Sequence, residues 1–303
     1  MQENMNDIMK HMQIKKRLSQ AIGRHFVCMS IIVFAIASAS GFVGSAMHSA
    51  HRLTNEIRAR TIVANEAYQR VQRVKQARQA KLAHIRNAEA EAKRRPRADI
   101  VHYSDTCTPV VDPASITVIV SKTRCFNPKK WQPNDLVSIG DNEYLRAEAA
   151  AHYTNMKQAI TAAGMSFSPS SAYRSYDDQV AVYDYWVTVN KNTDVADLVS
   201  ARPGYSEHQT GLAVDVKLGS CALECFATTP TYAWLREHGA EYGFIQRYPE
   251  KLASITGYET EVWHWRYVGV EIAQAMRRLG IETLELYMQF MDSERKYGNS
   301  ENR

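Results

Sequence analysis

Apolar and polar positions follow three different patterns along this chain of 303 residues. Residues 26–47 are largely apolar and carry no charge, a length that suits one crossing of a bilayer by a helix. From about 53 to 95 there is no Gly or Pro, and good helix formers dominate, which predicts a long helix that ends before Pro96. Beyond about residue 140 the pattern becomes that of a globular domain.

In the globular part, short helical and extended patterns alternate irregularly, which predicts an α+β fold with a mostly antiparallel sheet flanked by helices. The helical patterns cover 143–164, 176–189, 231–239, 270–280 and the amphipathic stretch after 281. The extended patterns cover 115–122, 165–174, 212–218 and 262–269.

The apolar stretch at 26–47 is interpreted as an uncleaved transmembrane anchor. A cleaved signal peptide is the alternative, because small residues follow the apolar run, but a preceding polar region of 25 residues is long for that role. Basic residues lie on both sides of the stretch and only weakly favour a cytoplasmic N-terminus. The globular part would then lie on the periplasmic or outer side of a bacterial cytoplasmic membrane.

Charge is distributed unevenly. The first 100 residues contain 18 Lys and Arg against 7 Asp and Glu, a net of +11, so the rest carries −6 of the overall +5. The predicted helix at 53–95 has a thin apolar stripe at heptad spacing that Arg78 interrupts, so a solvated stalk is favoured and a homodimer through a coiled coil remains possible. No aromatic residues interleave with the basic ones, which argues against nucleic-acid binding.

Four cysteines follow the apolar stretch, an even number that suits disulfides in an oxidising compartment. Proximity favours pairing Cys107 with Cys125 and Cys221 with Cys225, and free buried thiols are the alternative. Cys28 lies within the apolar stretch and is interpreted as an apolar residue.

Asp215 is an unusual residue for its place. In a strand over 212–218 it projects from the face opposite the apolar row, where an ionised carboxylate is costly unless it is solvated, paired or bound to a metal. His208 precedes the strand in a loop that can bend its imidazole back toward Asp215.

A second candidate segment, "TEVWHWRYVG", contains Glu261 and His264. With His208 and Asp215, His264 would complete a set of two imidazole nitrogens and one carboxylate that leaves a fourth zinc position open, as in catalytic zinc sites. Glu261 is then the natural base. Because residues three apart in a strand point to opposite faces, a turn or irregularity is predicted near Glu261.

Each of these residues also has a simpler interpretation. His264 lies among aromatic residues, which is the pattern of a core histidine. The spacing of His208 and Asp215 is weak evidence by itself, because a His and an Asp occur at any spacing by chance. Arg174 in "SAYRS" strengthens the hypothesis of a site, because a guanidinium at the end of an extended segment can bind a carboxylate or a developing oxyanion.

The segments "SAYRSYDDQ", "ARPGYSEHQTGLAVD", "YGFIQRYPE" and "TGYETEVWHWRYVG" resemble the VanY-type D-alanyl-D-alanine carboxypeptidases, which are zinc peptidases. The resemblance covers about 140–272 and implies zinc ligation by His208, Asp215 and His264, with Glu261 as base. Arg174 is similar to the family arginine near the scissile carbonyl. Gln179 and Ser206 match positions that help to hold the terminal D-alanine, and a cysteine-bearing insertion, "GSCALECFATTP", departs from the simplest family pattern.

The resemblance implies a membrane-anchored zinc D,D-carboxypeptidase that acts on peptidoglycan stem peptides. A dipeptidase or endopeptidase of the same group and a non-catalytic cell-wall-binding scaffold are the alternatives. The expected divisions are an N-terminal cytoplasmic segment, anchor, basic stalk, linker, zinc peptidase domain, and C-terminal helix with its tail, at 1–25, 26–47, 48–96, 97–139, 140–280 and 281–303.

Overall fold

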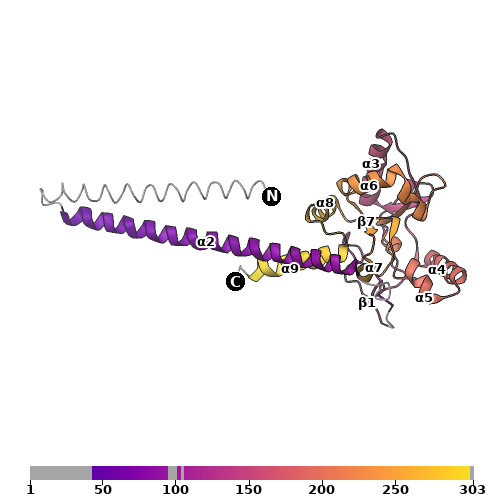
Figure 1. The fold of residues 1–303 in the computed structure, drawn as a ribbon, viewed down its shortest axis with the longest axis horizontal. Helices are drawn as coiled ribbons and strands as arrows, with labels where there is room; N and C mark the ends of the chain where they lie inside the picture. The colour runs from indigo at the N-terminus through magenta and orange to yellow at the C-terminus, as the bar shows by residue number, and fades with distance from the viewer. Residues whose placement is uncertain (1–42, 95–100, 104–105, 301–303) are drawn as a thin grey trace. The chain divides into compact units, whose positions relative to one another are not determined.

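The computed structural model describes residues 43–94, 101–103 and 106–300. The chain divides into two units, Met1–Gln76 and Ala77–Arg303, and the long helix α2 (Val43–Ala92) belongs partly to each (Figure 1). None of the helices in the described ranges has the length and apolar character needed to cross a membrane. Of the anchor predicted at 26–47, residues 26–42 lie outside the described residues.

The second unit is built around a four-stranded sheet with the strand order β5-β6-β8-β7. Every neighbouring pair in this sheet is antiparallel, so the predicted α+β class with an antiparallel sheet is confirmed. The strands are β5 (Ser168–Ser171), β6 (Ala213–Lys217), β8 (Glu261–Tyr267) and β7 (Phe244–Tyr248).

The two faces of the sheet differ in chemistry. Val214 pairs with Trp265 across β6 and β8, and both belong to the main core, together with buried residues of α3 (Ala147–Ala162) and α6 (Pro230–His238). Side chains alternate between faces, so the neighbouring pair Asp215 and His264 projects to the opposite side. The apolar face therefore fixes the strand register, and the register places the polar pair.

Shorter elements surround the sheet. After β5 come α4 (Tyr176–Asn190), α5 (Thr193–Val199) and the 3-10 turn η2 (Glu207–Thr210). The remaining elements are β1 (Thr108–Pro109), β2 (Arg124–Cys125), η3 (Leu223–Thr228), η4 (Gly239–Tyr242), α7 (Ala253–Thr256), α8 (Val270–Leu279) and α9 (Leu284–Ser300).

The helix predicted over 143–164 is wrong at its start. Residues Glu143–Arg146 form β4, which pairs with β3 (Leu136–Gly140) in a hairpin. The two residues between the strands, Asp141 and Asn142, both have positive φ, the conformation of the tight turns that favour Asp and Asn in hairpins. This turn chemistry outweighs the helix propensity of the residues that follow it.

The strand predicted over 115–122 is also wrong. Its central residues Val118 and Val120 are buried, but apart from one isolated bridge at Ser121 the segment pairs with no strand of the described residues. The carbonyl oxygens of Ile116 and Val118 instead accept hydrogen bonds from the Arg266 guanidinium, at 3.1 and 2.7 Å. A buried arginine thus takes the place of a neighbouring strand.

The end of α2 is integrated into the second unit. Ile85 is buried in a second apolar cluster with residues of α8 and α9. Arg86 donates to the carbonyl oxygen of Leu279 at the end of α8, and Glu89 accepts from the backbone N–H groups of Glu282 and Thr283. These contacts satisfy backbone groups at the end of one helix and just before the start of the next.

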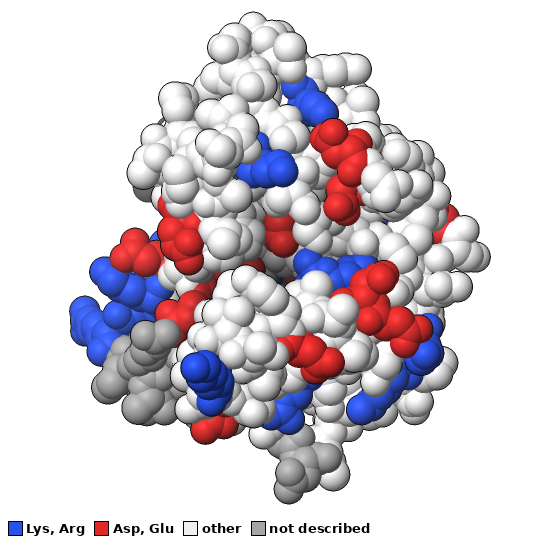
Figure 2. Space-filling view, turned by 90° about the vertical axis from the view of Figure 1, so that its right-hand side faces the viewer, with Lys and Arg blue, Asp and Glu red and all other residues white. Residues whose placement is uncertain are grey.

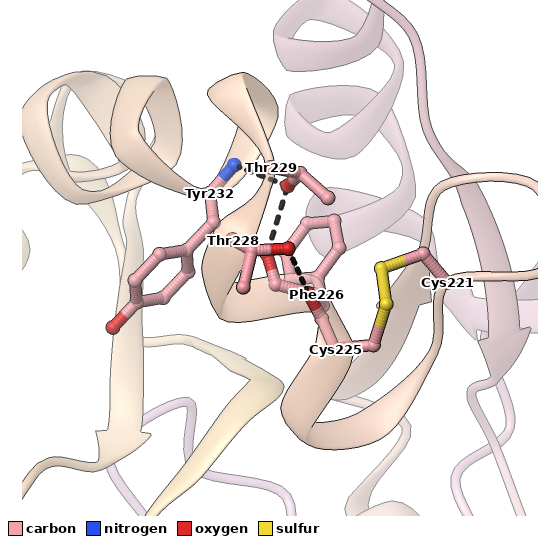
Figure 3. Close-up of a disulfide and its surroundings, with 6 residues drawn as sticks. All are labelled: Cys221, Cys225, Phe226, Thr228, Thr229 and Tyr232. Atoms are coloured by element: carbon pink, nitrogen blue, oxygen red, sulfur yellow. Dashed lines mark hydrogen bonds between the residues drawn. A yellow bond between two sulfur atoms is a disulfide. The ribbon is translucent and has the colours of Figure 1, made fainter.

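Both expected disulfides, Cys107–Cys125 and Cys221–Cys225, are present. The second closes the loop between β6 and η3 (Figure 3). Farther along the chain, Thr229 accepts from the N–H of Tyr232 and donates to the carbonyl oxygen of Phe226, so it caps α6. The cysteine-bearing insertion is therefore an ordered part of the domain.

Candidate metal centre

His208 is held by its backbone and by its ring. It lies in η2, a short turn that begins with Ser206 as N-cap and ends at Gly211, whose φ is +68°. The Nδ1 atom of His208 lies 2.6 Å from the carbonyl oxygen of Ala172, just after β5, so Nδ1 carries the proton and donates it. The other ring nitrogen, Nε2, is left without a proton and is available as a ligand.

Asp215 and His264 are directly opposed on β6 and β8. His264 Nδ1 lies 3.0 Å from one Asp215 oxygen, and His208 Nε2 lies 3.2 Å from the other. The two imidazole rings meet nearly edge to face at 4.9 Å between centroids. The structure therefore brings together the three residues that the sequence suggested as ligands.

The donor atoms of His208, Asp215 and His264 all lie within 4.8 Å of one another, and we call this group the metal centre. Asp215 Oδ1 is buried and makes no hydrogen bond with a described residue, although Nδ1 of His264 lies 3.0 Å away, and such an oxygen is costly unless a cation completes it. Two imidazole nitrogens and one carboxylate oxygen are the donors that zinc prefers. These residues fit a zinc ion on both counts.

Glu261 stands beside the metal centre. Its Oε2 lies 3.5 Å from Nδ1 of His264, although the two residues are three apart on β8. The pairing with β7 shifts register between Gln246 and Tyr248, opposite this stretch, so the irregularity expected near Glu261 is present. Burial raises the pKa of Glu261 to about 8.

The three residues of the metal centre influence one another's protonation. Burial would raise the pKa of Asp215, but the two histidines outweigh it and hold that pKa well below its ordinary value. Burial lowers the pKa of His208. For His264, burial also acts to lower the pKa, but the carboxylates of Asp215 and Glu207 outweigh burial and raise it to about 9.

Arg174 and Gln179 form one unit. The Arg174 guanidinium donates to Oε1 of Gln179 at 2.8 Å and to Oγ of Ser171 at 2.7 Å. Gln179 is buried, and its amide nitrogen donates to the carbonyl oxygen of Ala201. The structure thus places Gln179 behind Arg174, where it fixes the direction of the guanidinium.

Ser206 lies at the start of the loop that carries His208. Its side chain is buried, and Oγ accepts from the backbone N–H of His208 at 3.3 Å. In this arrangement the hydroxyl orients η2 directly.

Sequence reasoning missed the residues behind His264. Glu207 is buried, and Arg247 and Arg266 donate to its Oε1 at 2.8 and 2.7 Å. Glu207 stands next to His208 in the chain, and the two arginines lie in β7 and β8, where they are buried. An arginine in a strand-like segment signals a need for a buried acidic partner, but the sequence does not show which residue that partner is.

The molecule has a hollowed face. Figure 2 shows acidic side chains in and around this hollow, and basic side chains both beside it and toward the edges. Within the metal centre Asp215 keeps the most contact with solvent, with 15% of its side chain exposed.

An antiparallel sheet that presents two histidines, an aspartate and a neighbouring buried glutamate is the arrangement of a zinc peptidase. The sequence profile of the VanY family, described as D-alanyl-D-alanine carboxypeptidase, matches residues 142–270. The protein YodJ of Bacillus subtilis (strain 168) is 34% identical over 222 residues, which cover 69% of this chain and 80% of YodJ. The chain belongs to the VanY family of D-alanyl-D-alanine carboxypeptidases, and it is an enzyme of this zinc peptidase class.

Two solved structures share the fold. The LdcB LD-carboxypeptidase is 36% identical, with a TM-score of 0.56, and the match covers 63% of this chain and 92% of LdcB. The vancomycin resistance D,D-pentapeptidase VanY, solved in complex with Zn(II), is 28% identical, with a TM-score of 0.51, and the match covers 58% of this chain and 99% of VanY.

Proposed function

We propose that this protein is a zinc-dependent D,D-carboxypeptidase that removes the terminal D-alanine from peptidoglycan stem peptides. The observation that carries the proposal is the metal centre itself, with Glu261 Oε2 3.5 Å from one of its donor atoms. The family profile and the Zn(II) complex of VanY support the same reaction and the same metal.

His208, Asp215 and His264 would hold the zinc ion. A zinc ion bound by three protein ligands lowers the pKa of a water molecule toward neutrality and polarises a carbonyl oxygen. Glu261 accepts the proton of the attacking water and then donates it to the leaving amine of D-alanine as the amide bond breaks. Burial supports this role, because a carboxyl with a raised pKa can both accept and return a proton near neutral pH.

Arg174 would bind negative charge on the substrate. Its guanidinium is held by Gln179 and Ser171, so it is oriented before substrate arrives. An oriented guanidinium can bind the terminal carboxylate or the oxyanion that develops on the scissile carbonyl. Gln179 and Ser206 would support the terminal D-alanine, Gln179 through Arg174 and Ser206 through the loop of His208.

The bond that is cleaved distinguishes the candidate activities. The likeness to LdcB supports a second candidate, an L,D-carboxypeptidase that acts on the tetrapeptide stem. A dipeptidase or endopeptidase of the same group would release other fragments. We assign the D,D-activity because the family profile and the VanY structure both carry that specificity in their names.

Product analysis separates these activities. The zinc-loaded protein is incubated with a pentapeptide stem, with a tetrapeptide stem and with free D-alanyl-D-alanine, and the products are identified by mass spectrometry. The D,D-carboxypeptidase releases one D-alanine from the pentapeptide and stops at the tetrapeptide. An intact pentapeptide would contradict the proposal, and loss of D-alanine from the tetrapeptide alone would establish the L,D-activity.

We also propose that the apolar stretch at 26–47 anchors the chain in the cytoplasmic membrane, with the enzyme domain on the periplasmic or outer side. The two disulfides support an oxidising compartment. Membrane fractionation combined with protease accessibility of the domain in intact spheroplasts tests this placement. Recovery of the full-length chain in the soluble fraction would contradict it.

A further inference from the structure

Two buried polar atoms face each other behind the metal centre. Nε2 of His264 and Oε2 of Glu207 are 3.7 Å apart, and neither has a hydrogen-bond partner among the described residues. Nδ1 of the same ring points the other way, toward Asp215 and Glu261. Glu207 therefore lies behind the imidazole, on the side away from the other donor atoms.

The position of Glu207 is fixed by two arginines. Arg247 Nε and Arg266 Nη1 both donate to Oε1 of Glu207, and all three side chains are buried. Because both arginines donate to Oε1, the other carboxylate oxygen, Oε2, is left facing Nε2 of His264 at 3.7 Å.

Arg247 is in turn held by Glu285, a residue of α9. Its two terminal nitrogens donate to the two carboxylate oxygens of Glu285 at 3.0 and 2.5 Å, which is a bidentate contact with a fixed direction. α9 is tied to the end of α2, because Glu89 accepts from backbone N–H groups just before α9. A continuous set of charged contacts therefore runs from the C-terminal helix to His264.

We propose that Glu207 is a positioning residue that accepts the Nε2 proton of His264, and that Arg247 and Glu285 hold it in place. This inference rests on the proposed function, since it assigns His264 as a zinc ligand through Nδ1. A carboxylate that accepts the second ring proton of a ligating histidine fixes its tautomer and orientation and makes the ligand more basic. The C-terminal helix would thereby contribute to metal affinity without touching the metal.

The arrangement is more specific than fold stabilisation requires. A buried ion pair alone is weak evidence for stability, and well-packed apolar residues can often replace it. Here both arginines donate to Oε1 of Glu207, while Oε2 faces His264. That division of the two oxygens is what a positioning role needs.

The test is zinc affinity of the full chain, measured by competition with a chelator. Glu207→Gln should raise the zinc dissociation constant about 10- to 100-fold, as is typical when such an outer carboxylate is removed. Glu285→Gln should raise it by a smaller factor of about threefold or more, and its effect should disappear in the Glu207→Gln background, because the two act through one network. Cobalt(II) absorption spectra should shift in the same variants.

Glu294→Gln is the matched control. Glu294 lies on α9, as Glu285 does, and pairs with Arg78 at 3.2 Å. Glu294→Gln therefore removes the same charge from the same helix as Glu285→Gln, but it does not affect the contact with Arg247. Its zinc affinity and cobalt spectrum should equal those of the wild type. If circular dichroism shows that Glu207→Gln does not fold, the zinc affinity and cobalt spectrum of Glu285→Gln test the inference instead.

Wild-type zinc affinity in both Glu207→Gln and Glu285→Gln, with unchanged cobalt spectra, would overturn the inference. A wild-type chain that binds no zinc would instead refute the proposed metal centre. The two failures are thus distinguishable.

Discussion

Glu261 Oε2 lies 3.5 Å from Nδ1 of His264, although a regular strand would direct residues three apart to opposite faces. The register shift between β7 and β8 occurs opposite this stretch and removes the conflict. A base and a metal ligand can therefore come from one short strand. The irregularity is a functional feature, because regular pairing would separate the two side chains.

The role of Glu261 predicts the effect of removing its charge. Glu261→Gln should lower kcat by about 10²- to 10⁴-fold, the usual contribution of a general acid–base residue. Zinc content should stay at the wild-type value, because Glu261 is not one of the three ligands. Steady-state kinetics and elemental analysis check both points, with the exposed Glu250→Gln as control. A variant that keeps wild-type kcat would show that another group moves the proton.

Zinc binding should strengthen as pH rises. Without metal, the pKa of His264 is raised to about 9, so below that pH a proton must leave before Nδ1 can bind. The protonated ring stabilises the metal-free fold fully below about pH 6.5, the ordinary histidine pKa, and this contribution is lost as pH rises through about 9. The zinc-dependent increase in Tm, measured against an EDTA-treated sample, should therefore be larger at pH 8.5 than at pH 6. An increase that is equal at both values would contradict this coupling.

Arg174 should act mainly on substrate. Arg174→Ala removes a guanidinium that Gln179 and Ser171 hold in place, and kcat/KM should fall by about 10²-fold or more, as for loss of an oriented oxyanion donor. Arg174→Lys should recover little, because an ammonium cannot reproduce the planar fork. Kinetics on a pentapeptide stem measures both. Near-wild-type kcat/KM in Arg174→Lys would show that charge alone suffices.

The end of α2 should contribute to the stability of the enzyme domain. Ile85 has 1% of its surface exposed within the second apolar cluster, so Ile85→Ala should cost about 2–5 kcal/mol of unfolding free energy. Val74 lies on the same helix with 45% exposed, and Val74→Ala should change stability by no more than about 0.5 kcal/mol. Urea unfolding of both variants gives the comparison. Equal losses would mean that α2 does not pack as described.

Part of the fold was accessible from sequence because local patterns determine it. The alternation around Asp215 predicts a strand with one apolar face, and β6 has that face packed in the core. Strong caps also give readable boundaries, as at α8, which ends before Gly280. Residues 115–122 have an equally strong strand pattern, but their carbonyl groups bond to Arg266 from a distant strand. A local pattern cannot reveal such a partner.

The residues of the metal centre could be grouped from the sequence because His208 and Asp215 share one short segment and His264 has a Glu nearby. Their common location could not be derived from spacing, since it depends on the pairing of β6 with β8. The network behind His264 was out of reach, because Glu285 follows Glu207 by 78 positions and is linked to it through Arg247. Contacts of this kind are set by tertiary packing.

The central claim is that one zinc ion held by His208, Asp215 and His264 carries the reaction, and metal reconstitution tests it most directly. The metal-free protein and its His264→Ala variant are titrated with zinc while D-alanine release from a pentapeptide stem is followed. We expect no release without metal, full activity at one equivalent of zinc in the wild type, and no recovery in the variant at that zinc level. Full activity without metal, or wild-type recovery of His264→Ala at one equivalent, would contradict it.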